Sequence, residues 1–317
     1  MATGDLGPAQ LVLTSSVARR YYIQGMSKVE IANELDLSRF KVARLLELAR
    51  SSGLVRIEIA HPGEIDVAIS SDLRDAYGLQ HAVVVDTLEE DGAVLRQQIG
   101  KAAASLISEI VTSTDVLGLG WSRTLIATVA QLTALDAGSV VQLTGALAQS
   151  GYDHSSIDLV RDVARVAGCP AYYFYAPMIV PDLASAEVLL RQPEVVRAFS
   201  HFPSVTKAVV GIGGWAPPYS TLHDAVSVKE RRALVKAGAC ADLSGVLLDA
   251  DGVPISAELT HRIIGINAAR LRKIPEVIGL AYGAEKTSAA RAALVGGYVT
   301  SVVTHTSFAR SLLAAAP

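Results

Sequence analysis

Cysteine is scarce in this chain of 317 residues, which contains only Cys169 and Cys240. The two lie far apart and form no CxxC pair, so neither a disulfide framework nor a cysteine metal site is expected. We interpret both as buried structural residues. The seven histidines show no HxH or HExxH spacing, so we expect no metal and no cofactor.

Long apolar runs are also missing, although half of the residues are hydrophobic and the mean hydropathy is +0.36. Charged residues interrupt every apolar run well before the roughly 18 to 20 residues that a membrane-spanning helix needs. Residues 1–10 lack the basic region and apolar block of a secretory signal. We therefore expect a cytoplasmic protein with no membrane partner.

Charge is sparse, at 19% of residues, and the net charge is −3. Residues 1–60 hold eight Lys and Arg against six Asp and Glu, whereas the remainder holds 20 against 25. The first segment is therefore basic and the rest acidic, which suits a DNA-binding module joined to a sensor. Since domains average roughly 150 residues, the length also favours two domains.

Residues 1–60 are predicted to form a compact helical module. Apolar periodicity and glycine stops predict three helices, at residues 8–24, 27–35 and 38–51. Apolar and charged residues then alternate over residues 54–59, as in a strand. We place the domain boundary at the break that follows, at residues 61–63.

The connection between the second and third predicted helices is typical of a helix-turn-helix. Small Ala32 allows the helices to cross closely, Leu37 fills the corner, and Ser38 is a good N-cap. The turn needs a left-handed residue, a conformation that Asp36 tolerates. The strand at residues 54–59 would then form one side of a wing.

The third predicted helix has an apolar face and a polar face, and the polar face is predicted to enter the DNA groove. Our candidate DNA-binding residues are Ser38, Arg39, Phe40, Lys41 and Arg44. Arg39 and Arg44 can pair with guanine or phosphate, Phe40 can contact a thymine methyl group, and Lys41 is assigned to phosphate. The alternative is a helical module that mediates protein contacts.

From residue 66 onward, short β-rich runs alternate with amphipathic helical stretches. Strands are predicted at residues 82–86, 116–119, 140–143, 171–175, 208–212, 277–280 and 299–304, and helices at 96–111, 125–135, 158–167, 229–237 and 288–296. This alternation favours a parallel sheet covered by helices on both faces. Residues 61–317 are therefore predicted to form a Rossmann-like α/β domain.

A glycine-containing loop follows the predicted strand at residues 116–119 and precedes a helix expected to begin near Leu125. It consists of Gly120, Trp121, Ser122, Arg123 and Thr124. Free amides at a helix start favour an anion, so we interpret the loop as a phosphate cradle. It matches neither GxGxxG nor GxSxG, which disfavours a dinucleotide site and a nucleophile elbow. The alternative is an ordinary strand–helix turn.

Other candidate residues follow later strands. The glycine-rich turn 211–215, Asp242 and Lys286 are all expected near the carboxyl ends of strands, which meet at one edge of a parallel sheet. A carboxylate, an ammonium and a phosphate cradle together suit a phosphorylated polyol. By contrast, residues 249–252 are predicted to form a hairpin turn whose aspartates need no function.

The chain resembles the SorC family of sugar-binding transcriptional regulators over nearly its whole length. The matching stretches are residues 20–27, 31–32, 37–39, 41–42, 44–46, 118–124, 211–213, 238–242, 249–252 and 283–286. The resemblance implies a winged helix-turn-helix and an effector domain similar to sugar-phosphate isomerases and deaminases. It also implies phosphorylated sugars as effectors, and dimers or tetramers on operator DNA.

By motif, the resemblance assigns phosphate binding to residues 120–124 and the sugar hydroxyls to Asp242 and Lys286. The chain departs from the family pattern at Trp121 and Arg123, which crowd a loop that is usually small, so phosphorylation of the effector is left open. Phe40, Lys28 and Asp36 stand where the family often has Pro, Gln and Gly, so the operator sequence cannot be inferred from other members of the family. Two alternatives are a sugar-phosphate isomerase or deaminase carrying a DNA-binding head, and a DNA-binding scaffold whose sensor binds nothing.

Overall fold

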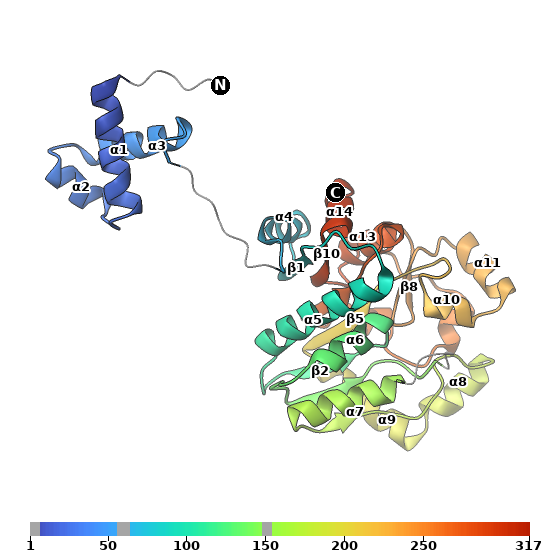
Figure 1. The fold of residues 1–317 in the computed structure, drawn as a ribbon. Coiled ribbons are helices and arrows are strands. Elements are labelled where there is room, and N and C mark those ends of the chain that lie inside the picture. Colours follow the sequence, from blue (N-terminus) through green and yellow to red (C-terminus); the bar gives the residue numbers. More distant parts are fainter. Residues whose placement is uncertain (1–6, 56–63, 148–153) are drawn as a thin grey trace. The chain divides into compact units, whose positions relative to one another are not determined.

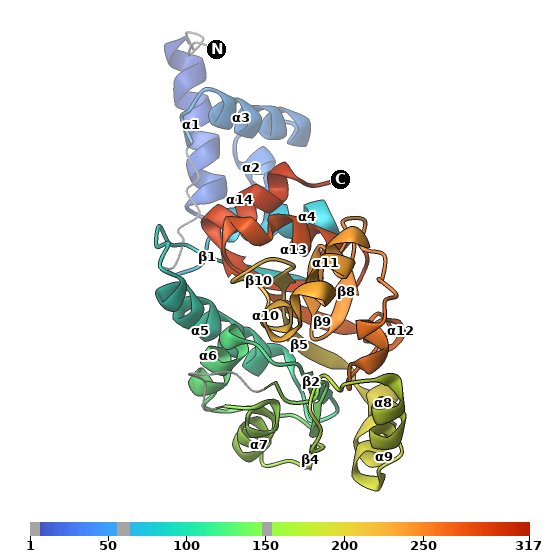
Figure 2. The same ribbon diagram turned by 90° about the vertical axis from the view of Figure 1, so that its right-hand side faces the viewer.

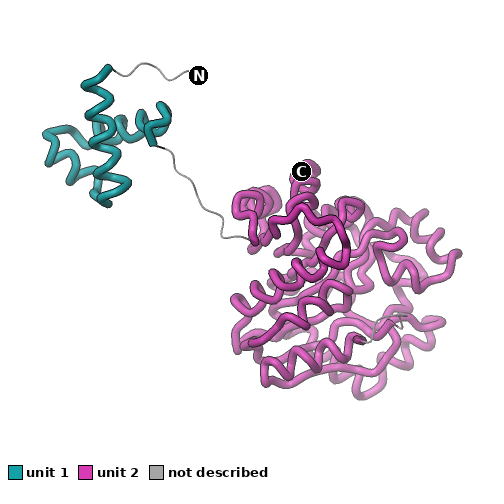
Figure 3. Tube along the Cα trace, viewed as in Figure 1, with its two compact units in different colours: residues 1–60 teal, residues 61–317 magenta. Residues whose placement is uncertain are grey.

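The computed structural model describes residues 7–55, 64–147 and 154–317. The chain divides into two compact units, residues 1–60 and residues 61–317, which Figure 3 distinguishes by colour. Within the described ranges, no helix is both long enough and apolar enough to cross a membrane.

The first unit contains three helices around a small apolar core. They are α1 (Pro8–Tyr22), α2 (Lys28–Glu34) and α3 (Arg39–Ser51). Val17, Ile31 and Val42, one from each helix, are completely buried together. Gly25 and Gly53 have positive φ angles of 69° and 75°, which end α1 and α3 at little steric cost.

The three predicted helices are thus confirmed, with ends that differ by one or two residues. Only residues 54 and 55 of the predicted wing strand are described, and neither is in a strand. The remainder of the predicted wing lies outside the described residues.

The second unit is built on a parallel sheet of seven strands in the order β1-β10-β9-β5-β2-β3-β4. The strands are β1 (His81–Val85), β2 (Val116–Leu119), β3 (Ser139–Gln142), β4 (Ala171–Tyr172), β5 (Lys207–Gly211), β9 (Glu276–Leu280) and β10 (Ser301–His305). A smaller antiparallel sheet contains β6 (Gly213–Gly214), β7 (Ala241–Leu243) and β8 (Val246–Leu248).

Helices cover both faces of the large sheet, as predicted (Figures 1 and 2). One face packs against α5 (Gly92–Ile110), α6 (Arg123–Gln131) and α7 (Ser156–Ala167), and the other against α4 (Val67–Tyr77), α13 (Thr287–Val295), α14 (Thr306–Ala314) and the small sheet. Successive side chains of a strand point to opposite faces of the sheet, so the core is divided into two apolar clusters, one on each face. In β5, Ala208 and Val210 belong to one cluster and Val209 to the other.

The remaining helices are short and lie in the connections. They are α8 (Leu183–Leu190), α9 (Pro193–Ser200), α10 (Thr221–Ala225), α11 (Val228–Lys236) and α12 (Ala268–Leu271), with 3-10 turns at Phe202–Ser204, Leu259–Arg262 and Ala284–Lys286. Of these helices, the sequence predicted only α11.

Three local predictions need correction. The strand predicted at residues 171–175 ends at Tyr172, because the Phe174 amide donates to the side chain of Gln142 instead of continuing the ladder. The helix predicted at residues 125–135 spans Arg123–Gln131, so it begins two residues earlier and ends four residues earlier than predicted. Both cysteines are half-buried rather than buried. The turn at residues 249–252 is confirmed, since the Asp249 amide donates to the Val253 carbonyl oxygen.

The connectivity reverses at β2. The chain proceeds from β2 to β3 and β4 on one side and then returns to place β5 on the other side. In open parallel sheets, the loops on either side of such a reversal leave a crevice at the carboxyl ends of the strands. The loops after β2 and β5 are the glycine-containing loops that the sequence singled out.

Candidate functional site

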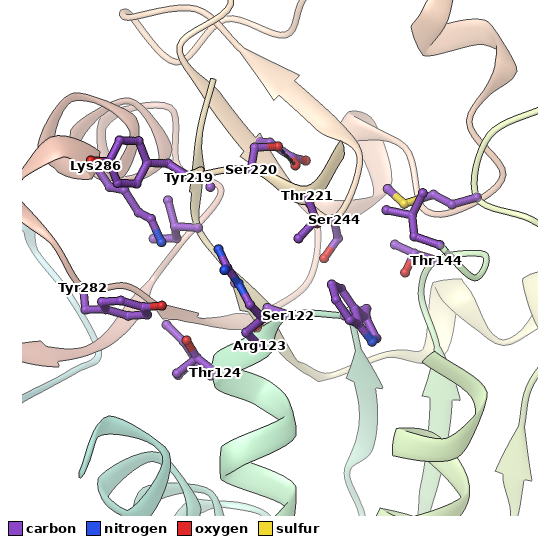
Figure 4. Close-up of a pocket in the computed structure, with 18 of the residues that line it drawn as sticks. Ser122, Arg123, Thr124, Thr144, Tyr219, Ser220, Thr221, Ser244, Tyr282 and Lys286 are labelled. Atoms are coloured by element: carbon purple, nitrogen blue, oxygen red, sulfur yellow. Dashed lines mark hydrogen bonds between the residues drawn. The ribbon is translucent and has the colours of Figure 1, made fainter. Parts of the chain in front are cut away.

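A pocket lies at this reversal point, between the two glycine-containing loops (Figure 4). The residues that line it include Trp121, Ser122, Arg123, Thr124, Thr144, Ser220, Asp242, Ser244, Tyr282 and Lys286. In Figure 4, Lys286 and Tyr282 lie at one end, Thr144 and Ser244 at the other, and Arg123 between them. The pocket therefore joins loops from β2, β3, β5, β7 and β9.

One end of the pocket is cationic. Lys286 is only 7% exposed, and its Nζ lies 4.5 Å from the centroid of the Tyr282 ring. Arg96 donates from Nη1 to the Tyr282 hydroxyl at 2.9 Å. Burial, and then the charges of Arg123 and Arg96, lower the pKa of Lys286 to about 8. Since no described carboxylate forms an ion pair with Lys286, this end favours an anion.

The first turn of α6 adds backbone donors. Ser122 is the N-cap, and its Oγ accepts from the Leu125 amide at 3.0 Å. The amides of Arg123 and Thr124 belong to the turn in which a helix has no internal acceptors. Gly211 makes room for this cap, because a Cβ there would lie 2.4 Å from the Ser122 Cβ. The Arg123 guanidinium donates to the Pro218 carbonyl oxygen at 2.9 Å.

Asp242 lies in the wall of the pocket and is deeply buried. Asp242 pairs with Gly213 of β6 in the small sheet. Because β6 follows β5 directly in the chain, this pairing holds Asp242 near the carboxyl end of β5, beside the pocket. Its Oδ2 accepts from the Ser220 hydroxyl at 2.8 Å and its Oδ1 from the Gly245 amide at 2.9 Å. Burial raises the pKa of Asp242 despite these two bonds.

The structure brings six of the seven predicted effector residues together. Trp121, Ser122, Arg123, Thr124, Asp242 and Lys286 line the pocket. Gly120 does not line it but lies behind the Ser244 hydroxyl, which would be 2.1 Å from a Cβ at that position. The assignment of effector binding to these residues stays a prediction.

Sequence reasoning missed six polar residues of the pocket: Thr144, Tyr219, Ser220, Thr221, Ser244 and Tyr282. Thr144 comes soon after a predicted strand, so the strand-end argument applied to Lys286 would also have found it. Tyr282 and Ser244 lie within four residues of Lys286 and Asp242. Ser220 carries no such signal.

The candidate nucleic-acid interface is the polar face of α3. The five predicted residues, Ser38, Arg39, Phe40, Lys41 and Arg44, are all exposed, Phe40 to 83%. The Ser38 hydroxyl accepts from the Lys41 amide at 3.1 Å, which confirms the predicted cap. Asp36 has a φ of 53°, which confirms the left-handed turn. DNA contact by these residues stays a prediction.

Among the described residues, no group of three or more His, Cys, Asp or Glu side chains is arranged to hold a metal ion.

Comparison with known proteins places the chain in a family. Residues 62–314 match the family model described as "Putative sugar-binding domain". The transcriptional regulator LsrR of Klebsiella pneumoniae subsp. pneumoniae is 29% identical, over 98% of this chain and 95% of its own. The structure of the sorbitol operon regulator SorC from Klebsiella pneumoniae matches with a TM-score of 0.73 and 24% identity, covering 96% of this chain and 99% of SorC. The chain belongs to the SorC family.

Other relatives of this SorC-family chain are also regulators. The deoxyribonucleoside regulator of Bacillus subtilis is 27% identical, over 95% of this chain and 97% of its own. The SorC-family chain is therefore a transcriptional regulator with a sugar-binding domain, and the alternative of an isomerase or deaminase is wrong.

Proposed function

We propose that this SorC-family regulator binds operator DNA specifically through residues 1–60 and that a small carbohydrate in the pocket controls this binding. The effector is a phosphorylated sugar or polyol. Residues 61–317 also mediate assembly into a dimer or tetramer, and the protein acts in the cytoplasm. The observation that carries the proposal is the buried Lys286 ammonium, which lines the same pocket as the first turn of α6.

The pocket suits a ligand with an anionic group. An oxyanion at the start of α6 would accept from the amides of Arg123 and Thr124, with Trp121 and Ser122 beside it and the backbone of Gly120 behind. Arg123 and Lys286 would supply charge-assisted hydrogen bonds that offset the loss of hydration. Asp242 and Lys286 would then meet the sugar hydroxyls.

The names of two relatives support a carbohydrate effector. The Bacillus subtilis relative is a deoxyribonucleoside regulator, and the Klebsiella pneumoniae structure is that of a sorbitol operon regulator. Each name refers to a compound that bears hydroxyl groups, which agrees with the polar lining of this pocket.

For DNA, we assign base contacts to Arg39, Phe40 and Arg44 and phosphate contact to Lys41. Ser38 lies at the start of the same helix and fixes its first turn. Arg39, Lys41 and Arg44 are all exposed on α3, and none of them forms an ion pair with a described carboxylate, so all three are available to DNA.

The proposal can be tested on the full chain by a ligand screen joined to a DNA-binding measurement. Operator fragments are selected from random-sequence DNA, and sugar phosphates and polyols are screened by thermal shift. A ligand that binds only the native state raises its stability by RT ln(1 + [L]/Kd). We expect at least one compound to raise the melting temperature and to change operator affinity. If no compound does both, the proposal is refuted.

Two variants test the residues of the pocket. Lys286→Ala and Asp242→Ala should each weaken effector binding by about 1.5–3 kcal/mol, as expected for hydrogen bonds to charged groups. Operator affinity without ligand should stay nearly unchanged. Lys273→Ala is the matched control, because Lys273 is exposed and does not line the pocket. A neutral polyol bound in the same pocket would overturn only the phosphate part of the assignment.

A further inference from the structure

Two hydroxyl groups at the end of the pocket opposite Lys286 have no hydrogen-bond partner. Thr144 is 1% exposed and Ser244 is 8% exposed. Neither Thr144 Oγ1 nor Ser244 Oγ bonds to any atom of the described part of the chain. Buried hydroxyls in native proteins are normally bonded, so a pair of unbonded hydroxyls in one pocket needs an explanation.

Ser244 lies in a turn whose backbone conformation is unfavourable for a residue with a side chain, and its neighbours hold it there. It forms the turn between β7 and β8 with a φ of 54°, a left-handed conformation that side-chain-bearing residues rarely adopt. The Asp242 carboxylate braces this turn by accepting from the Gly245 amide. Gly120 leaves room for the Ser244 hydroxyl, which a Cβ would displace. Strained backbone of this kind persists where the surrounding structure enforces it, often at ligand sites.

Thr144 is held just as firmly from the other side of the pocket. The buried Gln142 side chain donates from Nε2 to the Thr144 carbonyl oxygen at 2.7 Å and to the Ser156 hydroxyl at 3.0 Å. Thr144 also pairs with Gly265 in an isolated antiparallel bridge. The backbone that carries each unbonded hydroxyl is therefore fixed.

We infer that Thr144 and Ser244 recognise ligand hydroxyl groups, so that the pocket binds a molecule with an anionic group at one end and hydroxyls at the other. Hydroxyls of Thr and Ser both donate and accept, which matches the hydroxyls of a polyol. Asp242 is here a positioning residue for Ser244, in addition to its proposed contact with the ligand. The inference rests on the proposed function and extends it to the choice among phosphorylated ligands.

The test uses pairs of probes that differ only in their hydroxyl groups. D-Ribitol 5-phosphate is compared with n-pentyl phosphate, and D-glucitol 6-phosphate with n-hexyl phosphate, by calorimetry on the full chain. We expect the wild type to prefer the polyol phosphate of at least one pair. Thr144→Val and Ser244→Ala should each reduce that preference by about fivefold, the value of one neutral hydrogen bond. Binding of the alkyl phosphate should not change.

Ser244→Gly separates recognition from a purely structural role. Glycine adopts a positive φ without strain, so this variant should melt at a higher temperature than the wild type while its preference for the polyol phosphate falls about fivefold. Ser71→Ala, in an exposed position on α4, is the control and should change neither quantity.

Two results would overturn the inference and leave the proposed function standing. One is a wild type that binds polyol and alkyl phosphates equally well, and the other is an unchanged preference in both Thr144→Val and Ser244→Gly. If the wild type binds neither these phosphates nor free ribitol and glucitol, the proposed function and the inference fail together. Wild-type binding therefore distinguishes the two kinds of failure.

Discussion

The ionisation of Lys286 should make the affinity for an anionic ligand depend on pH. Burial keeps its pKa in the ligand-free protein at about 8, and a bound anion would raise that pKa by stabilising the ammonium. Between the two pKa values the complex holds a proton that the free protein has lost. Affinity for an anionic ligand should therefore be flat below pH 8 and should fall as the pH rises above it.

Calorimetry with D-ribitol 5-phosphate between pH 6.5 and 9.5 checks this prediction. The second phosphate pKa is about 6, so the ligand itself keeps its charge over most of this range. Lys286→Arg serves as a control because guanidinium stays protonated throughout. An affinity of the wild type that does not change between pH 7.5 and 9.5 would contradict the role of Lys286.

Arg44 is expected to contribute to operator affinity, since it projects from the exposed face of α3. Arg44→Ala should cost about 1–3 kcal/mol of operator affinity and relax specificity at one base position if the side chain reads a base. Arg19→Ala, in an exposed position on α1, is the control. Footprinting that finds unchanged affinity and sequence preference in the Arg39→Ala, Arg44→Ala double variant would refute the assignment.

At the scale of the element, α3 depends on its N-cap. The Ser38 hydroxyl accepts from the Lys41 amide, and loss of such a cap costs about 1 kcal/mol. Ser38→Ala should therefore lower the stability of residues 1–60 by that amount. Ser38→Asp keeps an acceptor but adds a negative charge to the proposed DNA face, so stability should be retained while operator affinity falls.

Thermal melts and DNA titrations of Ser38→Ala, Ser38→Asp and Ser38→Asn separate the two effects. Asparagine caps a helix without adding charge, so Ser38→Asn should behave like the wild type in both measurements. Equal DNA binding by Ser38→Asp and Ser38→Asn would show that this end of α3 does not approach the phosphate backbone.

At the scale of the whole molecule, the proposed oligomer follows from the size of the DNA-binding unit. Residues 1–60 carry only a small positive charge, and one small module buries too little surface for tight specific binding alone. We therefore expect a homo-oligomer on a repeated or palindromic operator. Light scattering at micromolar concentration checks this, and a monomer with full operator affinity would contradict it.

The sequence by itself determined features that depend on near neighbours. The cap at Ser38, the left-handed turn at Asp36 and the alternation of strands and helices all follow from patterns a few residues long. Such patterns also placed Lys286 and the loop at residues 120–124 at one edge of the sheet, because parallel strands end together.

Only the tertiary structure decided which residues face one another across the pocket. Thr144, Ser244 and Tyr282 line one pocket because β5 returns beside β2, and because the small sheet places Asp242 and its turn at the same edge. The early end of β4 likewise depends on Gln142, 32 positions from Phe174. These contacts join residues far apart in the chain, and the local periodicity of a single sequence contains no information about such pairs.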